Sequence, residues 1–313
     1  MRIRHKMAGK KTSFKVAAVQ ATPVFMDKQA TIDKACDLIN KAAGKGASLV
    51  VFPEAFVSAY PDWVWILPPA RKNLINSLYG ELLENAVSIP DESIDRLAKE
   101  AKNSGVYVTI GVNERNSEAS NSSLFNTLLY IGPDGKILGK HRKLIPTGGE
   151  RLMWSQGGGD TLVAFDTAIG KLGGLICWEN FMPLARNAMY IKGVQVYAAP
   201  TWDSSESWQI AMRYIAREGG MFVISCAQGI RMDDIPDRFE FKRYYPEGRE
   251  WVNRGNSCIV DPSGKFLAGP LEAEQSILLA DIDLSMIPEQ KWLYDVSGHY
   301  ARPDVFNFEI KIS

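Results

Sequence analysis

Short apolar runs alternate with segments of helical periodicity along the first third of the chain. Residues 14–20 (FKVAAVQ), 48–52 (SLVVF) and 106–112 (VYVTIGV) have the length and the β-branched content of strands. Between them, residues 28–43 and 93–103 carry apolar side chains at helical spacing. This β-α-β-α-β order predicts an α/β fold with well-buried central strands.

Hairpins and further strands follow in the second part of the chain. Residues 125–143 (FNTLLYIGPDGKILGKHRK) read as two strands around the turn signal PDG, and residues 161–177 (TLVAFDTAIGKLGGLIC) repeat this arrangement. Three more apolar segments predict strands, at 194–200, 221–227 and 256–269, and two amphipathic segments predict helices, at 183–192 and 205–218. The combination predicts a mixed sheet, or two sheets packed together with helices outside.

We expect a single domain over residues 14–313, because no linker rich in Pro, Gly or Ser and no internal repeat divides the chain. Residues 1–13 are basic and lack the apolar core of a secretory signal, so they are predicted to form a disordered leader. No apolar run approaches the roughly 20 residues that a membrane span requires.

The charge balance and the cysteine content limit the kinds of binding partner and the cellular location to be expected. Thirty-six basic residues balance 36 acidic ones, so no net charge attracts nucleic acid or an anionic membrane, and a small-molecule substrate is expected instead. The four cysteines form no CxxC pair, which favours reduced thiols and a cytoplasmic location. Three of them lie inside apolar helix or strand patterns and are predicted to be core residues: Cys36, Cys226 and Cys258.

Four polar residues stand where the predicted strands end or shortly beyond. Glu54 follows SLVVF and Pro53, Lys143 ends the first hairpin with Glu150 shortly after it, and Cys177 ends the second hairpin. In α/β sheets, functional groups collect at the carboxyl ends of strands. We therefore expect these four side chains to meet in one crevice.

Cys177 requires a proton acceptor if it is a nucleophile, because an unperturbed thiol is mostly protonated at neutral pH. His5 lies in the leader and His299 near the C-terminus, so an ordinary Cys–His pair would require His141. Glu54 is the better-placed base, because burial at a strand end would raise its pKa toward neutrality. A nearby lysine would favour the thiolate and stabilise negative charge growing on the substrate.

Three motifs resemble, in order, the Glu, Lys and Cys motifs of the nitrilase superfamily: VFPEAF (51–56), HRKLIPTGGER (141–151) and CWEN (177–180). Further segments are similar to its nitrilase branch: AYP (59–61), MPLAR (182–186), PTW (200–202) and GHYARPDVF (298–306). Amidase branches more often carry tyrosine and aspartate after the cysteine. The loop WSQGGGD (154–160) departs from the family pattern, and we expect it to line the approach to the pocket.

The resemblance, which extends over residues 14–305, implies a four-layer α-β-β-α sandwich with two mixed sheets. It implies that Cys177 is the nucleophile and Glu54 its general base, and that Lys143 holds the substrate nitrogen and the tetrahedral intermediate. Glu150 would orient the lysine or assist the attacking water, and the backbone amide of Trp178 would donate to developing charge.

Aromatic residues near these motifs suggest an apolar or aromatic nitrile as substrate. We expect the substrate pocket to draw on six residues: Tyr60, Trp63, Thr147, Trp178, Pro200 and Trp202. No cluster of His, Cys and Asp has the spacing of metal ligands, so neither a metal nor an organic cofactor is expected.

The implied activity is that of a nitrilase, which hydrolyses a small organic nitrile to the carboxylic acid and ammonia through a thioimidate and a thioester on cysteine. An amidase or a cyanide-degrading member of the superfamily would use the same residues. A partner-binding scaffold would lack one member of the Glu–Lys–Cys set, and a thiol redox sensor would require a resolving cysteine near Cys177.

The resemblance also implies self-association, since family subunits pack sandwich to sandwich and many members build longer spirals. Residues 181–193 (FMPLARNAMYIKG) have apolar side chains on more than one helix face, which suits a helix between subunits. We expect a homodimer or a larger homo-oligomer, with the C-terminal segment as an oligomerisation tail.

Overall fold

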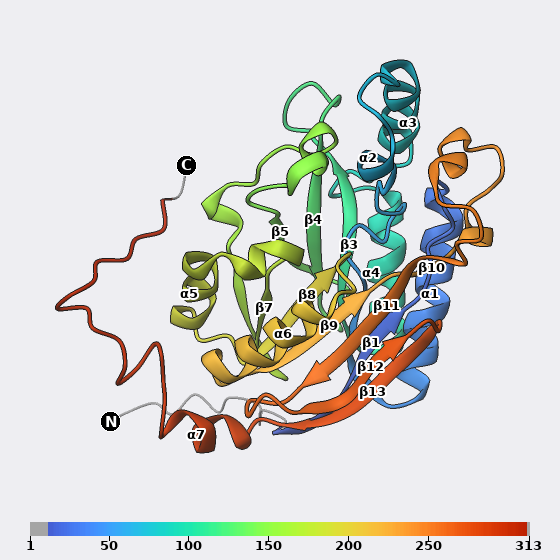
Figure 1. The fold of residues 1–313 in the computed structure, drawn as a ribbon. Coiled ribbons are helices and arrows are strands. Elements are labelled where there is room, and N and C mark those ends of the chain that lie inside the picture. The colour runs from blue at the N-terminus through green and yellow to red at the C-terminus, as the bar shows by residue number, and fades with distance from the viewer. Residues whose placement is uncertain (1–11, 312–313) are drawn as a thin grey trace.

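The computed structural model describes residues 12–311, which form two β-sheets packed against each other with helices on both outer sides (Figure 1). Most of the predicted leader, residues 1–11, lies outside the described part of the chain. Ser13 already belongs to the first strand, so this strand begins one residue earlier than the pattern predicts.

The first sheet is mixed. Its six strands are, in spatial order, β13 (Ser276–Asp283), β1 (Ser13–Gln20), β2 (Ala47–Val51), β3 (Tyr107–Arg115), β4 (Leu124–Ile131) and β5 (Ile137–Arg142). The β1–β2 and β2–β3 pairs are parallel, as the β-α-β-α-β pattern requires, and the other neighbours are antiparallel.

The second sheet is also mixed. Its seven strands are β10 (Gly229–Arg231), β11 (Trp251–Val260), β9 (Phe222–Ala227), β8 (Val196–Thr201), β7 (Gly170–Gly174) and β6 (Ala164–Thr167) in that order, with β12 (Phe266–Glu272) paired to β11. Here β7, β8 and β9 run parallel to one another. Their carboxyl ends therefore lie at one edge of the sheet.

Helices cover the outer faces of the two sheets. The α-helices are α1 (Lys28–Gly44), α2 (Trp63–Ile66), α3 (Lys72–Glu84), α4 (Glu92–Ser104), α5 (Pro183–Ile191), α6 (Glu206–Gly219) and α7 (Met286–Lys291). Helices α1 and α4 pack on the side of the first sheet and α5 and α6 on the side of the second (Figure 1). This arrangement is the expected α-β-β-α sandwich.

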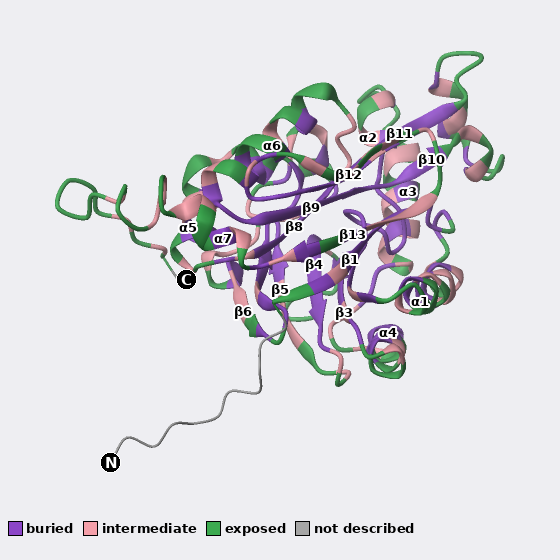
Figure 2. Ribbon diagram, turned by 90° about the horizontal axis from the view of Figure 1, so that it is seen from below, coloured by how far each residue is buried: buried purple, intermediate pink, exposed green. Residues whose placement is uncertain are grey.

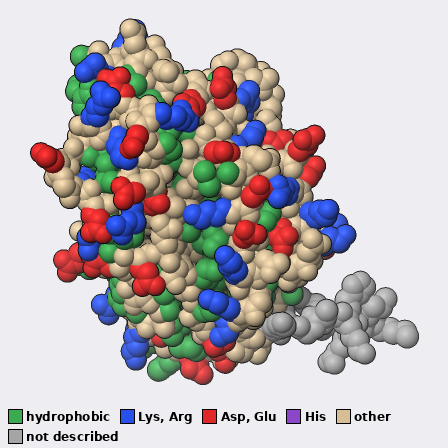
Figure 3. Space-filling view, turned by 90° about the vertical axis from the view of Figure 1, so that its right-hand side faces the viewer, with side chains coloured by type: hydrophobic (Ala, Val, Ile, Leu, Met, Phe, Trp, Pro, Cys, Tyr) green, Lys and Arg blue, Asp and Glu red, His purple; other side chains and the backbone are tan. Residues whose placement is uncertain are grey.

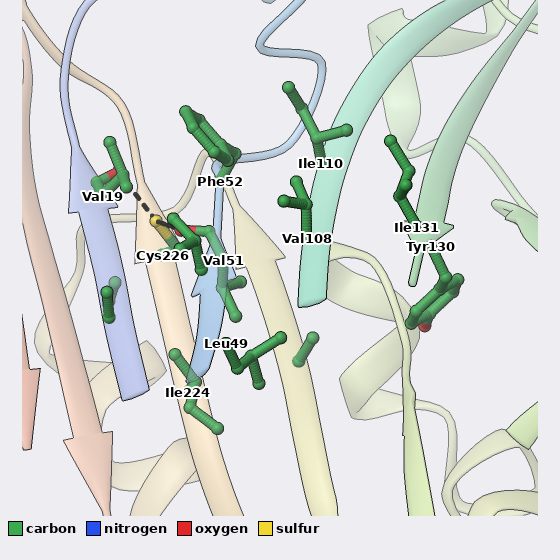
Figure 4. Packing of buried hydrophobic residues seen from close by; sticks show 14 of the residues in the cluster. Val19, Leu49, Val51, Phe52, Val108, Ile110, Tyr130, Ile131, Ile224 and Cys226 are labelled. Carbon is green, nitrogen blue, oxygen red and sulfur yellow. Dashed lines mark hydrogen bonds between the residues drawn. The ribbon is translucent and has the colours of Figure 1, made fainter. Parts of the chain in front are cut away.

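The main core lies between the sheets and beneath α1 and α4. Figure 4 shows Cys226 of β9 pointing at β1, and its Sγ donates a 2.8 Å hydrogen bond to the Val19 carbonyl. Cys36 and Cys258 are buried as well, so all three cysteines occupy the core positions that the apolar pattern predicts. Figure 2 shows the buried strands at the centre and the exposed outer faces of the helices around them.

The surface carries both signs of charge. On the face drawn in Figure 3, basic and acidic side chains are interspersed and no large field of one sign is present. Within residues 12–311, no helix has the length and apolarity to cross a membrane.

Candidate active site

Lys143, the residue after β5, stands between two carboxylates. Its Nζ donates to Glu54 Oε1 over 2.8 Å and to Glu150 Oε2 over 2.7 Å, and all three side chains are buried. Cys177 and Glu150 line the same cavity. The structure therefore brings together the four residues that the strand-end pattern selects.

Glu54 is held by a close approach between its loop and strand β3. Gly111 of β3 accommodates this approach, since a Cβ there would lie 2.3 Å from the Pro53 carbonyl oxygen. Asn126 of β4 donates to Glu54 Oε1 over 2.7 Å, whereas Glu54 Oε2 is buried and has no hydrogen-bond partner in the described residues. One carboxylate oxygen is thus fixed and the other is free to accept a proton.

Glu150 is fixed by its own 3₁₀-helix, η1 (Gly148–Leu152). The Thr147 amide donates to Glu150 Oε2 over 2.7 Å, as in a capping box, and the Tyr60 hydroxyl donates to Oε1 over 2.6 Å. Trp65 Nε1 in turn donates to the Tyr60 hydroxyl over 3.0 Å. A chain of hydrogen bonds therefore runs from the cavity wall to Lys143.

Cys177 begins the 3₁₀-helix η3 (Cys177–Phe181), three residues after β7 ends. Its φ of +50° lies in the left-handed region, which non-glycine residues adopt rarely and often at functional sites. Gly174, the last residue of β7, lies very close to the backbone of the neighbouring strand β8. A Cβ at this position would be 2.0 Å from the Ala198 carbonyl oxygen, so glycine is required just before Cys177. The sulfur accepts a 3.3 Å hydrogen bond from Thr201 Oγ1.

Burial dominates the electrostatics of the cluster. It raises the pKa of Cys177, and the Glu54 charge raises it further, while Lys143 only partly opposes this. Burial also raises the pKa of Glu54, against the opposing charge of Lys143. Both shifts favour the protonated, uncharged forms of the two side chains, so the Cys177 thiol needs a base at the moment of attack.

Lys143 keeps its proton in this setting. Burial alone would lower the pKa of Lys143, but the charges of Glu54 and Glu150 and the Glu150 hydrogen bond outweigh burial and raise it. The buried ammonium is held by two carboxylates, and its positive charge lowers the pKa of Cys177 in opposition to burial.

His141 does not serve Cys177. Its Nε2 lies 3.0 Å from Glu179 Oε2 and its Nδ1 lies 2.9 Å from the Thr161 carbonyl oxygen, so both ring nitrogens are occupied. Burial lowers the pKa of His141, and the charge and hydrogen bond of Glu179 outweigh burial and raise it. The alternative of an ordinary Cys–His pair is therefore wrong.

Glu179 joins the two segments that carry Lys143 and Cys177. It accepts hydrogen bonds from the amide of Leu144 over 2.6 Å and from the amide of Ile176 over 2.8 Å. Each of these amides is adjacent in sequence to one of the two functional residues. The glutamate of CWEN thus fixes the lysine loop to the cysteine turn.

A cavity of about 820 Å³ opens at Cys177. Tyr60, Thr147, Trp178 and Trp202 line it, as predicted, and Tyr60 stacks on Trp202 with ring centroids 4.3 Å apart. Nine further lining residues were not predicted: Asp62, Trp65, Gly148, Asp203, Ser204, Ser205, Arg249, Val252 and Asn253.

Two predicted pocket residues lie elsewhere. Trp63 is fully buried among Phe25 and Phe241, and Trp65, two residues further along α2, faces the cavity instead. Pro200 is buried in β8 and does not line the cavity. Residues 154–160 are also absent from the lining, so the expectation that this loop borders the pocket is not met.

Neither a metal site nor a disulfide accompanies the cluster. Among residues 12–311 no group of three or more His, Cys, Asp or Glu side chains is arranged to hold a metal ion. All four cysteines are free and buried.

Comparison with known proteins shows the family of this chain. The family model described as carbon-nitrogen hydrolase matches residues 15–291. The chain belongs to the carbon-nitrogen hydrolase family.

Relatives in this family are similar over nearly their whole length. An aliphatic nitrilase from Sinorhizobium fredii is 44% identical over 96% of this chain and 96% of its own. A bifunctional nitrilase/nitrile hydratase from Lupinus angustifolius is 43% identical over 95% of this chain and 86% of its own. Nitrilase 1 from Arabidopsis thaliana is 41% identical over 96% of this chain and 87% of its own.

Solved structures support the fold. A carbon-nitrogen hydrolase from Helicobacter pylori matches with a TM-score of 0.71 at 22% identity, covering 95% of this chain and 97% of its own. A nitrilase-superfamily member from Saccharomyces cerevisiae matches with a TM-score of 0.69 at 23% identity, covering 94% and 100%.

Proposed function

We propose that this enzyme, a nitrilase, converts a small organic nitrile to the carboxylic acid and ammonia through a covalent intermediate on Cys177. The observation that carries the proposal is the buried Glu54–Lys143–Glu150 array beside a cavity-facing thiol. Its curated relatives of 39–44% identity are nitrilases, which supports the same activity here.

Attack begins with proton transfer from Cys177 to Glu54 as the sulfur adds to the nitrile carbon. The free Oε2 of Glu54 is the oxygen available to take the proton. The proton then moves to the nitrile nitrogen, which gives a neutral thioimidate and restores the carboxylate. The net charge of the buried cluster is the same before and after this step.

Water completes the reaction in two additions. Glu54 activates the first water, which adds to the thioimidate and gives a tetrahedral species carrying OH, NH₂ and sulfur. Loss of ammonia leaves a thioester, and a second water hydrolyses it to the acid and the free thiol. Lys143 and the Trp178 amide stabilise the charge that develops on the substrate.

The same tetrahedral species has a second exit. If the C–S bond breaks before the C–N bond, the products are an amide and the free thiol. Protonation of the nitrogen decides between the two exits, because an amine departs only as a protonated group. Lys143, Glu54 and Glu150 are the buried titratable groups that would control this protonation.

The cavity favours an organic nitrile over hydrogen cyanide. Its volume of about 820 Å³ and its walls of Tyr60, Trp65, Trp178 and Trp202 suit a substrate with an apolar body.

Matched substrates test the proposal. Ammonia release is measured with a nitrile, the amide of the same carbon skeleton and potassium cyanide, each at equal concentration. We expect ammonia and acid from the nitrile at a rate well above that from the amide. Faster release from the amide would assign an amidase, and release from cyanide alone a cyanide-degrading enzyme.

We also propose that the protein self-associates and is located in the cytoplasm. Helices α5 and α6 expose large apolar side chains, including Leu184, Ile191 and Ile210, which supports a homodimer or a larger assembly through this face. The exposed Trp292 and Phe306 of the segment after α7 suit its expected role as an oligomerisation tail. Four buried free thiols support a reducing, cytoplasmic environment.

A further inference from the structure

Thr201 is the last residue of β8 and is almost completely buried beside the sulfur of Cys177. Its Oγ1 lies 3.3 Å from Cys177 Sγ. Among residues 12–311, no other side chain makes a hydrogen bond to this sulfur. Lys143 directs its hydrogen bonds to Glu54 and Glu150 instead.

The orientation of the hydroxyl is set by a second contact. The backbone amide of Asp203 donates to Thr201 Oγ1 over 2.9 Å, which occupies the oxygen as an acceptor. Thr201 is also held in the ladder opposite Ala227 of β9, and a β-branched side chain has few rotamers. The hydroxyl hydrogen is therefore directed at the sulfur.

We propose that Thr201 is a further catalytic residue, whose hydroxyl stabilises negative charge on the Cys177 sulfur when the sulfur attacks and when it is expelled. The proposal rests on the proposed function only in assigning Cys177 as the nucleophile. A hydrogen bond to a charged acceptor is about twice as strong as one to a neutral acceptor.

The hydrogen bond from Thr201 to Cys177 therefore matters most in the steps in which the C–S bond forms or breaks. Sulfur is a weak acceptor in a thiol, a thioimidate or a thioester, and a strong one when it carries the charge of a thiolate. Thr201 thus stabilises the transition states for C–S bond formation and cleavage more than it stabilises the covalent intermediates.

The two exits of the tetrahedral species depend on Thr201 differently. Release of the amide breaks the C–S bond and places the electron pair on sulfur, whereas release of ammonia breaks the C–N bond and leaves sulfur bonded to carbon. Loss of the hydroxyl should slow the amide exit more than the ammonia exit. The ratio of amide to acid is therefore a readout of this hydrogen bond.

The test compares Thr201→Val, which keeps the shape and loses the hydroxyl, with Thr201→Ser, which keeps the hydroxyl. Thr109→Val is the matched control, because Thr109 is a buried threonine in β3 whose hydroxyl has no partner in the described residues. Two quantities are measured: alkylation of Cys177 by iodoacetamide at one fixed pH, followed by peptide mass, and kcat and KM for the nitrile.

We expect Thr201→Val to slow alkylation and to lower kcat by about 10- to 100-fold, with KM nearly constant and a smaller share of any amide formed. Thr201→Ser should restore both rates to within a few-fold, and Thr109→Val should leave them unchanged. If Thr201 only shaped the pocket through Trp202 and Asp203, the valine variant would raise KM and alkylate at the wild-type rate, which would overturn the proposal. Alkylation does not require nitrile turnover, so an enzyme inactive on nitriles would refute the proposed function and leave this test intact.

Discussion

At the scale of single residues, the site depends on charges that are buried before any substrate arrives. Lys143 has no exposure to water and would be costly to bury alone, and Glu54 and Glu150 compensate it with two short hydrogen bonds. The thiol of Cys177 stays neutral in this environment, because burial and the Glu54 charge both raise its pKa. Chemistry at Cys177 therefore needs the Glu54 base at the moment of attack.

Replacing Cys177 should abolish turnover and leave the fold intact. Cys177→Ala removes the nucleophile and only a small volume from the cavity wall, so we expect ammonia release to fall to background with an unchanged circular dichroism spectrum. Cys36→Ala is the control, since this buried cysteine lies on α1 away from the cavity, and it should retain full activity. More than a trace of activity in Cys177→Ala would refute the covalent mechanism.

The pH profile should report Glu54. Because burial raises the pKa of Glu54 above its ordinary value of 4.5, the carboxylate that accepts the thiol proton is lost at a higher pH than in an exposed glutamate. We predict that kcat/KM falls on acidification with a midpoint above 4.5 and by about tenfold per pH unit below it.

The matched variant for that profile is Glu54→Gln, which keeps the side-chain shape and removes the base. Its kcat should drop by about 10²- to 10⁴-fold, and the remaining rate should no longer show the acid limb. An acid limb that persists unchanged in Glu54→Gln would assign the titration to another group.

At the scale of elements, the site is made by strand ends that two glycines bring into position. Gly111 allows the backbone of the Glu54 loop to approach β3 closely. Gly174 allows the backbones of β7 and β8 to approach each other closely just before Cys177. Glu179 then joins η3 to the end of β5 through the Leu144 and Ile176 amides. The functional residues are rigid because the backbone that carries them is hydrogen-bonded on both sides.

Glu179→Gln should destabilise the protein by about 3–5 kcal/mol, because it removes one partner of a fully buried pair with His141. The glutamine would also leave one of the two amides without an acceptor. Urea denaturation followed by tryptophan fluorescence measures this difference. A decrease in the free energy of unfolding of less than about 1 kcal/mol would show that the Glu179–His141 pair contributes little to stability.

The contribution of the Glu179–His141 pair to stability depends on pH, and the sign of this dependence follows from the two shifted pKa values. The pKa of Glu179 is lowered, since burial, which raises it, is outweighed by His141 and the two amides, so its contribution is present above 4.5 and lost in acid. The pKa of His141 is raised, so its contribution is present below 6.5 and lost as the pH rises through the folded value. The stability difference between wild type and variant should be largest between pH 4.5 and 6.5.

The sequence predicted those elements whose burial pattern is strong. Helix α4 has Ile94, Leu97 and Ala101 buried on one face, and the first hairpin carries the clear turn signal PDG. Helix α3 was not predicted, because only Leu78 and Leu82 of its 13 residues are buried. Strand β13 was missed for a similar reason, since it is a largely half-buried edge strand.

The four central site residues were predicted because each follows an apolar strand in a motif. The pocket walls were less predictable, since Trp63 and Trp65 share one short helix and only the packing of α2 decides which one faces the cavity. Arg249 lies in the loop before β11 and Asn253 lies within β11, and no local pattern connects either residue to Cys177. Asn126 could have been noticed as a polar residue inside the apolar run FNTLLYI.

At the scale of the whole molecule, the sandwich leaves one helical face without a covering layer. Leu184 is 69% exposed on α5 and Ile210 is 61% exposed on α6, on the side opposite α1 and α4. Apolar side chains of this size on neighbouring helices are typical of an interface. We therefore place the proposed subunit contact there.

Leu184→Asp should shift the protein toward the monomer, because the interface would have to bury a charge. Sedimentation velocity at a fixed micromolar concentration measures the shift. Val24→Asp is the control, as Val24 is 37% exposed in the loop before α1 and should not alter the assembly. A fully active wild-type monomer would contradict the proposed oligomer.

Intact-protein mass spectrometry during turnover of a nitrile tests covalent catalysis at Cys177 most directly. Covalent catalysis predicts a transient mass increase equal to the nitrile for the thioimidate, or to the acyl group minus the displaced thiol hydrogen for the thioester. The adduct should map to the peptide that contains Cys177 and be absent from Cys177→Ala. Steady ammonia release without any adduct on Cys177, under rapid acid quench, would contradict covalent catalysis at this residue.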